Sequence, residues 1–91
     1  FCATDNLAIG ALIYLREQGR KVPGEIQVTG TGDIPMGQIV VPKLTTVHYY
    51  YKTSGKEAAS MLVGLLESEE AIRKEIKMGY EIILRDTTKN E

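Results

Sequence analysis

The chain has 91 residues, of which 43% are apolar and 25% are charged, and its formal net charge at pH 7 is −1. This composition is typical of a globular domain, and no run of about 18 apolar residues could cross a membrane. Lysine and arginine are scattered among the acidic residues, which excludes the concentrated basic face that binds a phosphate backbone. One cysteine, Cys2, excludes an internal disulfide and a cysteine-cluster metal site, and it favours a reducing compartment.

The chain opens at Phe1 without an initiating Met or the features of a signal peptide, so we expect a piece of a longer protein. Residues 1–3 are expected to end a strand. Thr4 or Asp5 is the expected N-cap of a first helix, because a short polar side chain accepts a bond from an otherwise unpaired N–H group. Gly19 stands where a left-handed residue ends a helix.

The first helix carries two apolar stripes at helical spacing. Ile9 and Ile13, four residues apart, form the second stripe beside the first. Two stripes imply two buried faces, one against a sheet and one against a neighbouring helix or a second subunit. The first stripe consists of Leu7, Ala8, Ala11, Leu12 and Leu15.

Residues 26–29 are the next predicted strand, which should run parallel to residues 1–3 in a right-handed βαβ unit. The loop 30–35 follows at its carboxyl end, where open α/β sheets bind ligands. Residues 44–51 are rich in β-branched and aromatic residues and predict a further strand.

Ser54 and Glu57 match a capping box and predict a second helix from Ser54. Residues 76–85 then alternate in hydropathy, which predicts a strand. Residues 86–91 are expected to be a polar tail. The predicted buried face of the second helix consists of Ala58, Ala59, Met61, Leu62, Leu65 and Leu66.

The loop Gly30-Thr31-Gly32 matches half of a dinucleotide-binding fingerprint, but the third glycine would fall at Pro35. A tight turn is the commoner use of such glycines. Asp33 is a candidate general base without a paired carboxylate or histidine in the sequence, so a turn cap or a ligand acceptor is favoured.

His48 is the one histidine, and a half-exposed strand residue is favoured over a catalytic or metal-binding role. Tyr49 and Tyr51 should share one side of the strand, where tyrosines either pack or stack on a sugar or base. Cys2 is favoured as a small core residue over a nucleophile. No nucleophile, base or metal set can be assembled, so we expect no enzyme, no metal and no cofactor.

Several short motifs follow one another over nearly all of the chain. They are Ala3-Thr4-Asp5, Ala8-Ile9-Gly10-Ala11, Leu15-Arg16-Glu17-Gln18-Gly19, Val22-Pro23, Ile26-Gln27-Val28-Thr29-Gly30, Pro42-Lys43-Leu44-Thr45-Thr46-Val47, Gly55-Lys56-Glu57-Ala58-Ala59 and Leu84-Arg85-Asp86-Thr87-Thr88. In this order they resemble the last third of the effector-binding region of the LacI/GalR family of bacterial transcriptional repressors. The opening and the run Tyr-Lys-Thr-Ser-Gly-Lys-Glu-Ala look most similar to sucrose operon repressors.

The resemblance implies an α/β fold, specifically the parallel-sheet βαβ portion of a two-lobed, periplasmic-binding-protein-like type I fold. Residues 1–45 and 80–91 would belong to the C-terminal lobe, and residues 46–79 would cross into the other lobe. A small effector, a sugar or sugar phosphate, would bind between the lobes. The implied protein is a cytoplasmic homodimer that binds DNA through a headpiece absent from these residues.

Carried over by position, the ligand-binding candidates are Thr4, Asp5, Gly32, Asp33, Tyr49 and Tyr51. Gly32 stands where many family members place an Asp that bonds sugar hydroxyls, so this pocket cannot use the same carboxylate. The dimer-interface candidates are Ile9, Ile13, Ile39 and Val40.

The leading hypothesis is the effector-binding and dimerisation part of a sugar-responsive repressor. An extracytoplasmic sugar-binding protein of a transport system shares the fold and is the alternative. An enzyme on a doubly wound fold is disfavoured.

Overall fold

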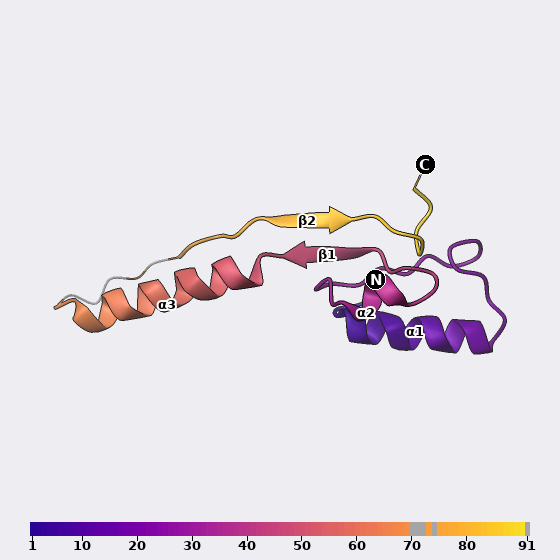
Figure 1. Ribbon diagram of the computed structural model, residues 1–91, viewed down its shortest axis with the longest axis horizontal. Helices are drawn as coiled ribbons and strands as arrows, with labels where there is room; N and C mark the ends of the chain where they lie inside the picture. The colour runs from indigo at the N-terminus through magenta and orange to yellow at the C-terminus, as the bar shows by residue number, and fades with distance from the viewer. Residues whose placement is uncertain (70–72, 74, 91) are drawn as a thin grey trace. The chain divides into compact units, whose positions relative to one another are not determined.

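The computed structural model describes residues 1–69, 73 and 75–90. The chain divides into two compact units, the first formed by Phe1–His48 with Glu81–Glu91 and the second by Tyr49–Tyr80. Strands β1 and β2 are hydrogen-bonded neighbours and run in opposite directions (Figure 1). The elements are α1 (Asp5–Glu17), α2 (Met36–Ile39), β1 (Thr46–Tyr49), α3 (Tyr51–Glu67) and β2 (Tyr80–Ile83).

Helix α1 is capped at both ends as its sequence predicts. Thr4 is extended, and its hydroxyl oxygen accepts a 3.3 Å bond from the N–H of Leu7. At the other end Gly19 has φ +70°, and its N–H donates to the carbonyl of Arg16 at 3.1 Å. The N–H of Arg20 donates to the carbonyl of Leu15 at 2.9 Å, which completes a Schellman motif. The predictions for Thr4 and Gly19 are therefore confirmed.

The apolar core of the first unit is small. It consists of Ala8 and Leu12 from α1 with Val28 and Leu44. Leu7 of the predicted first stripe is 60% exposed, and so does not belong to the buried face. The face of α1 that carries Ala8 and Leu12 is buried within the chain, and the second face, predicted to meet a neighbouring helix or a second subunit, stays a prediction. Partly buried side chains packed against this core are Cys2, Ile9, Leu15, Val22 and Val40.

Buried threonines join this core to the C-terminal segment. Thr87 is fully buried; its hydroxyl donates to the carbonyl of Val28 at 2.6 Å and accepts from the N–H of Thr45 at 2.9 Å. The expectation of a polar tail over residues 86–91 is therefore wrong at Thr87. A buried polar group must be hydrogen-bonded, and these two long-range bonds satisfy it.

The parallel strands expected at residues 1–3 and 26–29 do not form as regular strands. The N–H of Cys2 donates to the carbonyl of Thr29 at 2.9 Å, and Thr29 forms an isolated parallel bridge with Thr45. Residues 1–3 and 26–29 are thus joined by one backbone hydrogen bond, whereas a regular pair of strands needs consecutive ones. The regular pairing is instead between β1 and β2, and β2 covers four residues where ten were predicted.

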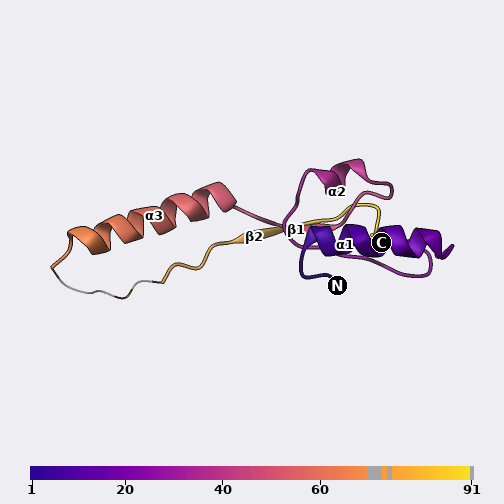
Figure 2. The same cartoon turned by 90° about the horizontal axis from the view of Figure 1, so that it is seen from below.

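Helix α3 begins at Tyr51, three residues before the predicted start. The N–H of Ser54 donates to the carbonyl of Tyr50 at 2.9 Å, so Ser54 lies inside the first turn and the predicted capping box is wrong. No residue of α3 is buried, and Leu62 and Leu66 are 58% and 78% exposed, so its predicted buried face is exposed. Figure 2 shows the chain passing from β1 into α3 and returning through β2.

Candidate functional site

The loop 30–35 lies at the predicted ligand-binding end of the first unit and is held by hydrogen bonds to β1. Gly32 has φ +127° and Asp33 has φ +57°, so two consecutive residues adopt conformations that are uncommon for residues with a side chain. The N–H of Gly32 donates to the carbonyl of Val47 at 2.8 Å, and the N–H of Asp33 donates to the hydroxyl of Thr46 at 3.3 Å. These bonds attach the loop to β1.

Asp5 also holds the loop 30–35 in place, through its side chain and its backbone N–H group. Its side chain is 1% exposed; Oδ1 accepts from the hydroxyl of Thr46 at 2.6 Å, and Oδ2 accepts from the N–H of Ile34 at 2.9 Å. The backbone N–H of Asp5 donates to the carbonyl of Thr31 at 3.0 Å. Asp5 is therefore buried and stabilises the shape of the loop. Its carboxylate is not exposed, so it is not placed to contact a ligand directly as predicted.

Asp33 is paired in the structure, although the sequence offered no visible partner. Its Oδ1 lies 2.9 Å from Nη2 of Arg85, and its Oδ2 lies 3.1 Å from Nδ1 of His48. Nη1 of Arg85 also donates to the carbonyl of Leu44 at 3.0 Å. The Asp33 side chain is 13% exposed, so this cluster is largely shielded from water. We conclude that Asp33 ties the loop to the end of β1 and to the segment after β2.

The sequence could not reveal this cluster, because its members lie 15 and 52 positions apart. His48 lies in β1 and its side chain is 35% exposed, as predicted for a half-exposed strand residue. The contact between His48 and Asp33 is one that the sequence did not show. A general-base role for Asp33 has no support here, since both of its oxygens already meet cationic or donor groups.

Tyr49 and Tyr51 belong to the second unit. Tyr51 is the first residue of α3, so the expectation that Tyr49 and Tyr51 share one side of a strand is wrong. Their rings nevertheless meet edge to face, with centroids 6.1 Å apart and planes at 73°. Tyr49 is 39% and Tyr51 59% exposed, so each ring keeps surface on which another molecule could pack.

The remaining ligand candidates lie in the first unit. Thr4 is exposed and its hydroxyl serves the helix cap, whereas Gly32 is buried. Among the described residues, no group of three or more His, Cys, Asp or Glu side chains is arranged to hold a metal ion. No described helix has the length and apolar character needed to traverse a bilayer.

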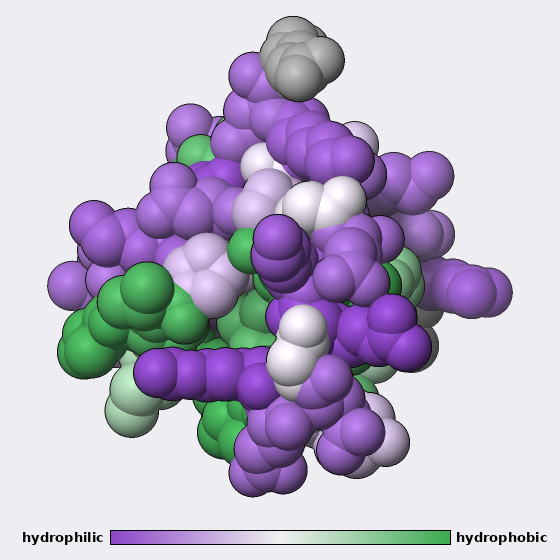
Figure 3. All heavy atoms as spheres, turned by 90° about the vertical axis from the view of Figure 1, so that its right-hand side faces the viewer, coloured by the Kyte–Doolittle hydropathy of each residue, from purple (hydrophilic) through white to green (hydrophobic). Residues whose placement is uncertain are grey.

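The predicted dimer residues lie around a second, apolar feature. A hollow of about 160 Å³ is lined by Ile9, Ile13 and Val40, together with Leu12, Arg16 and Val41. Ile13 and Ile39 are 55% and 70% exposed. The face seen in Figure 3 is mostly hydrophilic, with hydrophobic side chains gathered to one side.

The family of the chain follows from comparison with known proteins. A model of the periplasmic binding protein-like domain matches residues 1–88. The chain belongs to this family. The α/β, periplasmic-binding-protein-like fold class expected from the sequence is therefore confirmed.

Members of the periplasmic binding protein-like family that resemble this chain include transcriptional regulators. The chain is 34% identical to the HTH-type transcriptional repressor PurR of Vibrio campbellii and 38% identical to the HTH-type transcriptional regulator GalR of Streptococcus thermophilus, over 98% of its own length in each case. It covers 27% of each of these relatives, about a quarter of their length.

A solved structure agrees with these relatives. A LacI family transcriptional regulator from Enterococcus faecium with bound ribose superposes with a TM-score of 0.83 and 27% sequence identity, over 94% of this chain and 32% of that one. The resemblance to LacI/GalR-type regulators is thus confirmed at the level of the domain.

Proposed function

We propose that the chain forms the C-terminal part of the effector-binding domain of a LacI/GalR-type transcriptional repressor that regulates sugar-utilisation genes. The observation that supports this most is that nearly the whole chain aligns with regulators of that type, one of them with ribose bound. The protein acts in the cytoplasm, catalyses no reaction, needs no cofactor and contacts DNA through a headpiece outside these residues.

Residues 1–45 and 80–91 belong to the C-terminal lobe in this proposal, and residues 46–79 cross into the other lobe. The effector is a sugar or sugar phosphate, and the residues that we assign to its binding are Thr4, Gly32 and Asp33 in the first unit and Tyr49 and Tyr51 in the second. Asp5 supports the loop 30–35 from inside. Effector binding changes DNA affinity because the ligand binds the two lobe arrangements unequally.

Calorimetric titration of the full-length protein with ribose and with sucrose tests the effector site. Sucrose is included because the opening and the Tyr-Lys-Thr-Ser run resemble sucrose operon repressors. Tyr51→Ala should weaken binding of the sugar that binds, since stacking area is lost. The matched control is Tyr14→Ala, which removes a ring of similar exposure (60%) from α1. Equal affinities of the two variants would remove Tyr51 from the site.

The dimer surface in this proposal is formed by Ile9, Ile13, Ile39 and Val40. Exposed apolar side chains around a hollow are typical of surfaces that pack against another protein. Ile13→Asp should shift the full-length protein towards monomer in sedimentation velocity, because it buries a charge in an apolar contact. Leu7→Asp is the control, since Leu7 is 60% exposed on the same helix. An unchanged dimer in Ile13→Asp contradicts the assignment.

The alternative is an extracytoplasmic sugar-binding protein that supplies a transporter, because the fold is shared. The two functions differ in one measurable property. A repressor binds DNA with an affinity that changes on adding the sugar, whereas a transport protein binds the sugar with no such linkage. A DNA-binding titration of the full-length protein with and without sugar separates them.

A further inference from the structure

A second hollow lies at the C-terminal end of α1, away from the proposed effector site. It has a volume of about 440 Å³ and is within the range of small-molecule sites in proteins. Along α1, Arg16 is twelve residues from Thr4, which corresponds to about 18 Å of helix. The hollow is lined by Leu12, Arg16, Gly19, Arg20, Val22, Val41 and Pro42.

The backbone around this hollow is held in place by hydrogen bonds. The Schellman motif fixes the end of α1 at Gly19 and Arg20. The N–H groups of Glu25 and Ile26 both donate to the carbonyl of Lys21, at 2.9 and 3.2 Å, which fixes the turn that carries Val22. These bonds fix the part of the lining formed by Gly19, Arg20 and Val22, which lowers the entropic cost of binding there.

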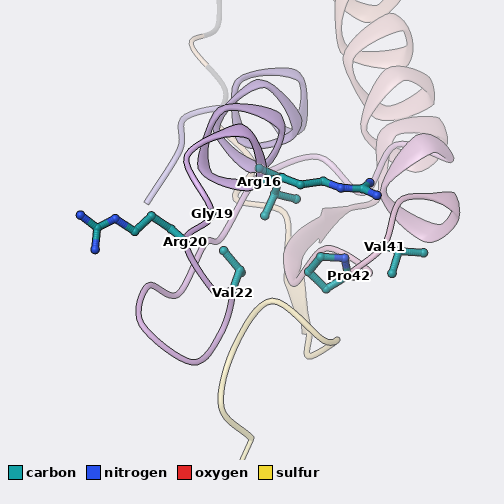
Figure 4. Close-up of a pocket in the computed structure, with 7 residues that line it drawn as sticks. Arg16, Gly19, Arg20, Val22, Val41 and Pro42 are labelled. Atoms are coloured by element: carbon teal, nitrogen blue, oxygen red, sulfur yellow. The ribbon is translucent and has the colours of Figure 1, made fainter.

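The two arginines differ in direction and in pairing. Arg20 points away from the hollow (Figure 4), and its Nη1 lies 3.1 Å from Oε2 of Glu25 in an exposed pair. Arg16 extends across the hollow towards Val41 (Figure 4). Within the described part of the chain, the structure gives the Arg16 guanidinium no ion pair or hydrogen bond. Arg16 thus places a cation beside the apolar residues of the lining, and the lining contains no acidic residue.

We propose that this hollow binds a small organic acid in which one carboxylate is attached to an apolar body. A guanidinium matches a carboxylate with two parallel N–H···O bonds. Leu12, Val22 and Pro42 supply the surface that an alkyl body would cover. This site is separate from the effector site, and it does not depend on the proposed function.

The site also touches the proposed dimer surface. Leu12, Arg16 and Val41 line both this hollow and the smaller one beside Ile9 and Ile13. A bound acid would therefore lie next to any second copy packed on that surface. The rival occupant is an acidic side chain of that second copy, and the experiment below distinguishes it.

Saturation-transfer NMR on the full-length protein tests the proposal with three probes: hexanoate, acetate and hexanol. Hexanoate should bind saturably, and more tightly than acetate, which lacks the apolar body, or hexanol, which lacks the charge. Arg16→Gln should weaken hexanoate binding by about 10-fold to 100-fold, the usual effect of losing a charged hydrogen-bond partner. Lys21→Gln is the control, because it removes an exposed cation outside the lining, and it should leave hexanoate binding unchanged.

Four outcomes overturn the proposal. Hexanoate that fails to saturate rules out a binding site, and acetate binding as tightly as hexanoate rules out the apolar subsite. Hexanoate binding that is equal in wild type and Arg16→Gln places the acid elsewhere, including the effector site. If Arg16→Gln changes sedimentation of the dimer but not hexanoate binding, the occupant is a second copy. Circular dichroism of both variants verifies that each is folded.

Discussion

Replacing Gly30 by Ala is the sharpest test of how α1 and the loop 30–35 are joined. A Cβ atom on Gly30 would overlap Oδ1 of Asp5 and would lie 3.2 Å from Cβ of Ala8 and from Cα of Asp5. Gly30 does not have positive φ, so the substitution tests space and not backbone strain. The Asp5 carboxylate must move to admit the methyl group.

The cost follows from what the Asp5 carboxylate holds. Overpacking of a tight interior costs about 1–3 kcal/mol, and each hydrogen bond to a charged group contributes about 1.5–3 kcal/mol. Movement of Oδ1 threatens the bond from the Thr46 hydroxyl first. We therefore expect Gly30→Ala to lower the free energy of unfolding by about 2.5–6 kcal/mol, a large fraction of the stability of an ordinary domain.

Urea unfolding of the full-length protein, followed by tyrosine fluorescence and circular dichroism, measures this loss. Gly10→Ala is the control, because nothing lies within 4 Å of a Cβ there and the residue is in α1. Alanine in place of a helical glycine should raise stability by up to about 1 kcal/mol. If Gly30→Ala stays within about 0.5 kcal/mol of the wild type, below the overpacking range, the contact between Gly30 and Asp5 is not as described.

Two further predictions concern the buried polar groups. Asp5→Asn keeps the shape of the side chain but leaves one acceptor oxygen in place of two. Urea unfolding should therefore show a loss of about 1–3 kcal/mol in the free energy of unfolding. An unchanged free energy would mean that Asp5 does not hold the loop. Thr87→Val is isosteric and removes the bonds to Val28 and Thr45, which leaves a buried N–H group unpaired. It should cost about 2–4 kcal/mol by the same measurement, and Thr88→Val, at a less buried position, should cost less.

Local patterns in the sequence predicted the helix caps, strand and helix that are determined by residues close to one another in the chain. The Thr4 cap, the left-handed Gly19, strand β1 and the body of α3 all depend on side chains within a few positions of one another. Each of these signals reflects a local hydrogen bond or a local periodicity. They were therefore visible without knowledge of the fold.

The candidate site depended on distant residues, and much of it was missed. Asp33 meets Arg85 across 52 positions, and Asp5 meets Thr46 across 41. Thr87 looked like part of a polar tail because its partners lie 42 and 59 positions away. No periodicity links such residues, so only the folded chain could show that the predicted ligand residues Asp5 and Asp33 are engaged within the protein.

The start of α3 was misplaced for a different reason. The capping-box pattern at Ser54 is a genuine local signal, but the chain leaves β1 at Tyr50 with φ −83° and ψ 72° and enters the helix at once. The connection from the strand therefore decided where the helix begins. Local propensity is a weak guide where tertiary connections compete with it.

The pairing of β1 with β2 makes residues 50–79 an insertion whose entry and exit are neighbours. Because the two strands run in opposite directions, a short hairpin turn could join them directly (Figure 1). Such a deletion leaves Asp5, the threonine contacts and the Asp33 cluster with their partners, since all of these lie outside the excised span. Residues 50–79 can therefore be exchanged for another segment, in evolution or by design, while the core residues of the first unit stay unchanged.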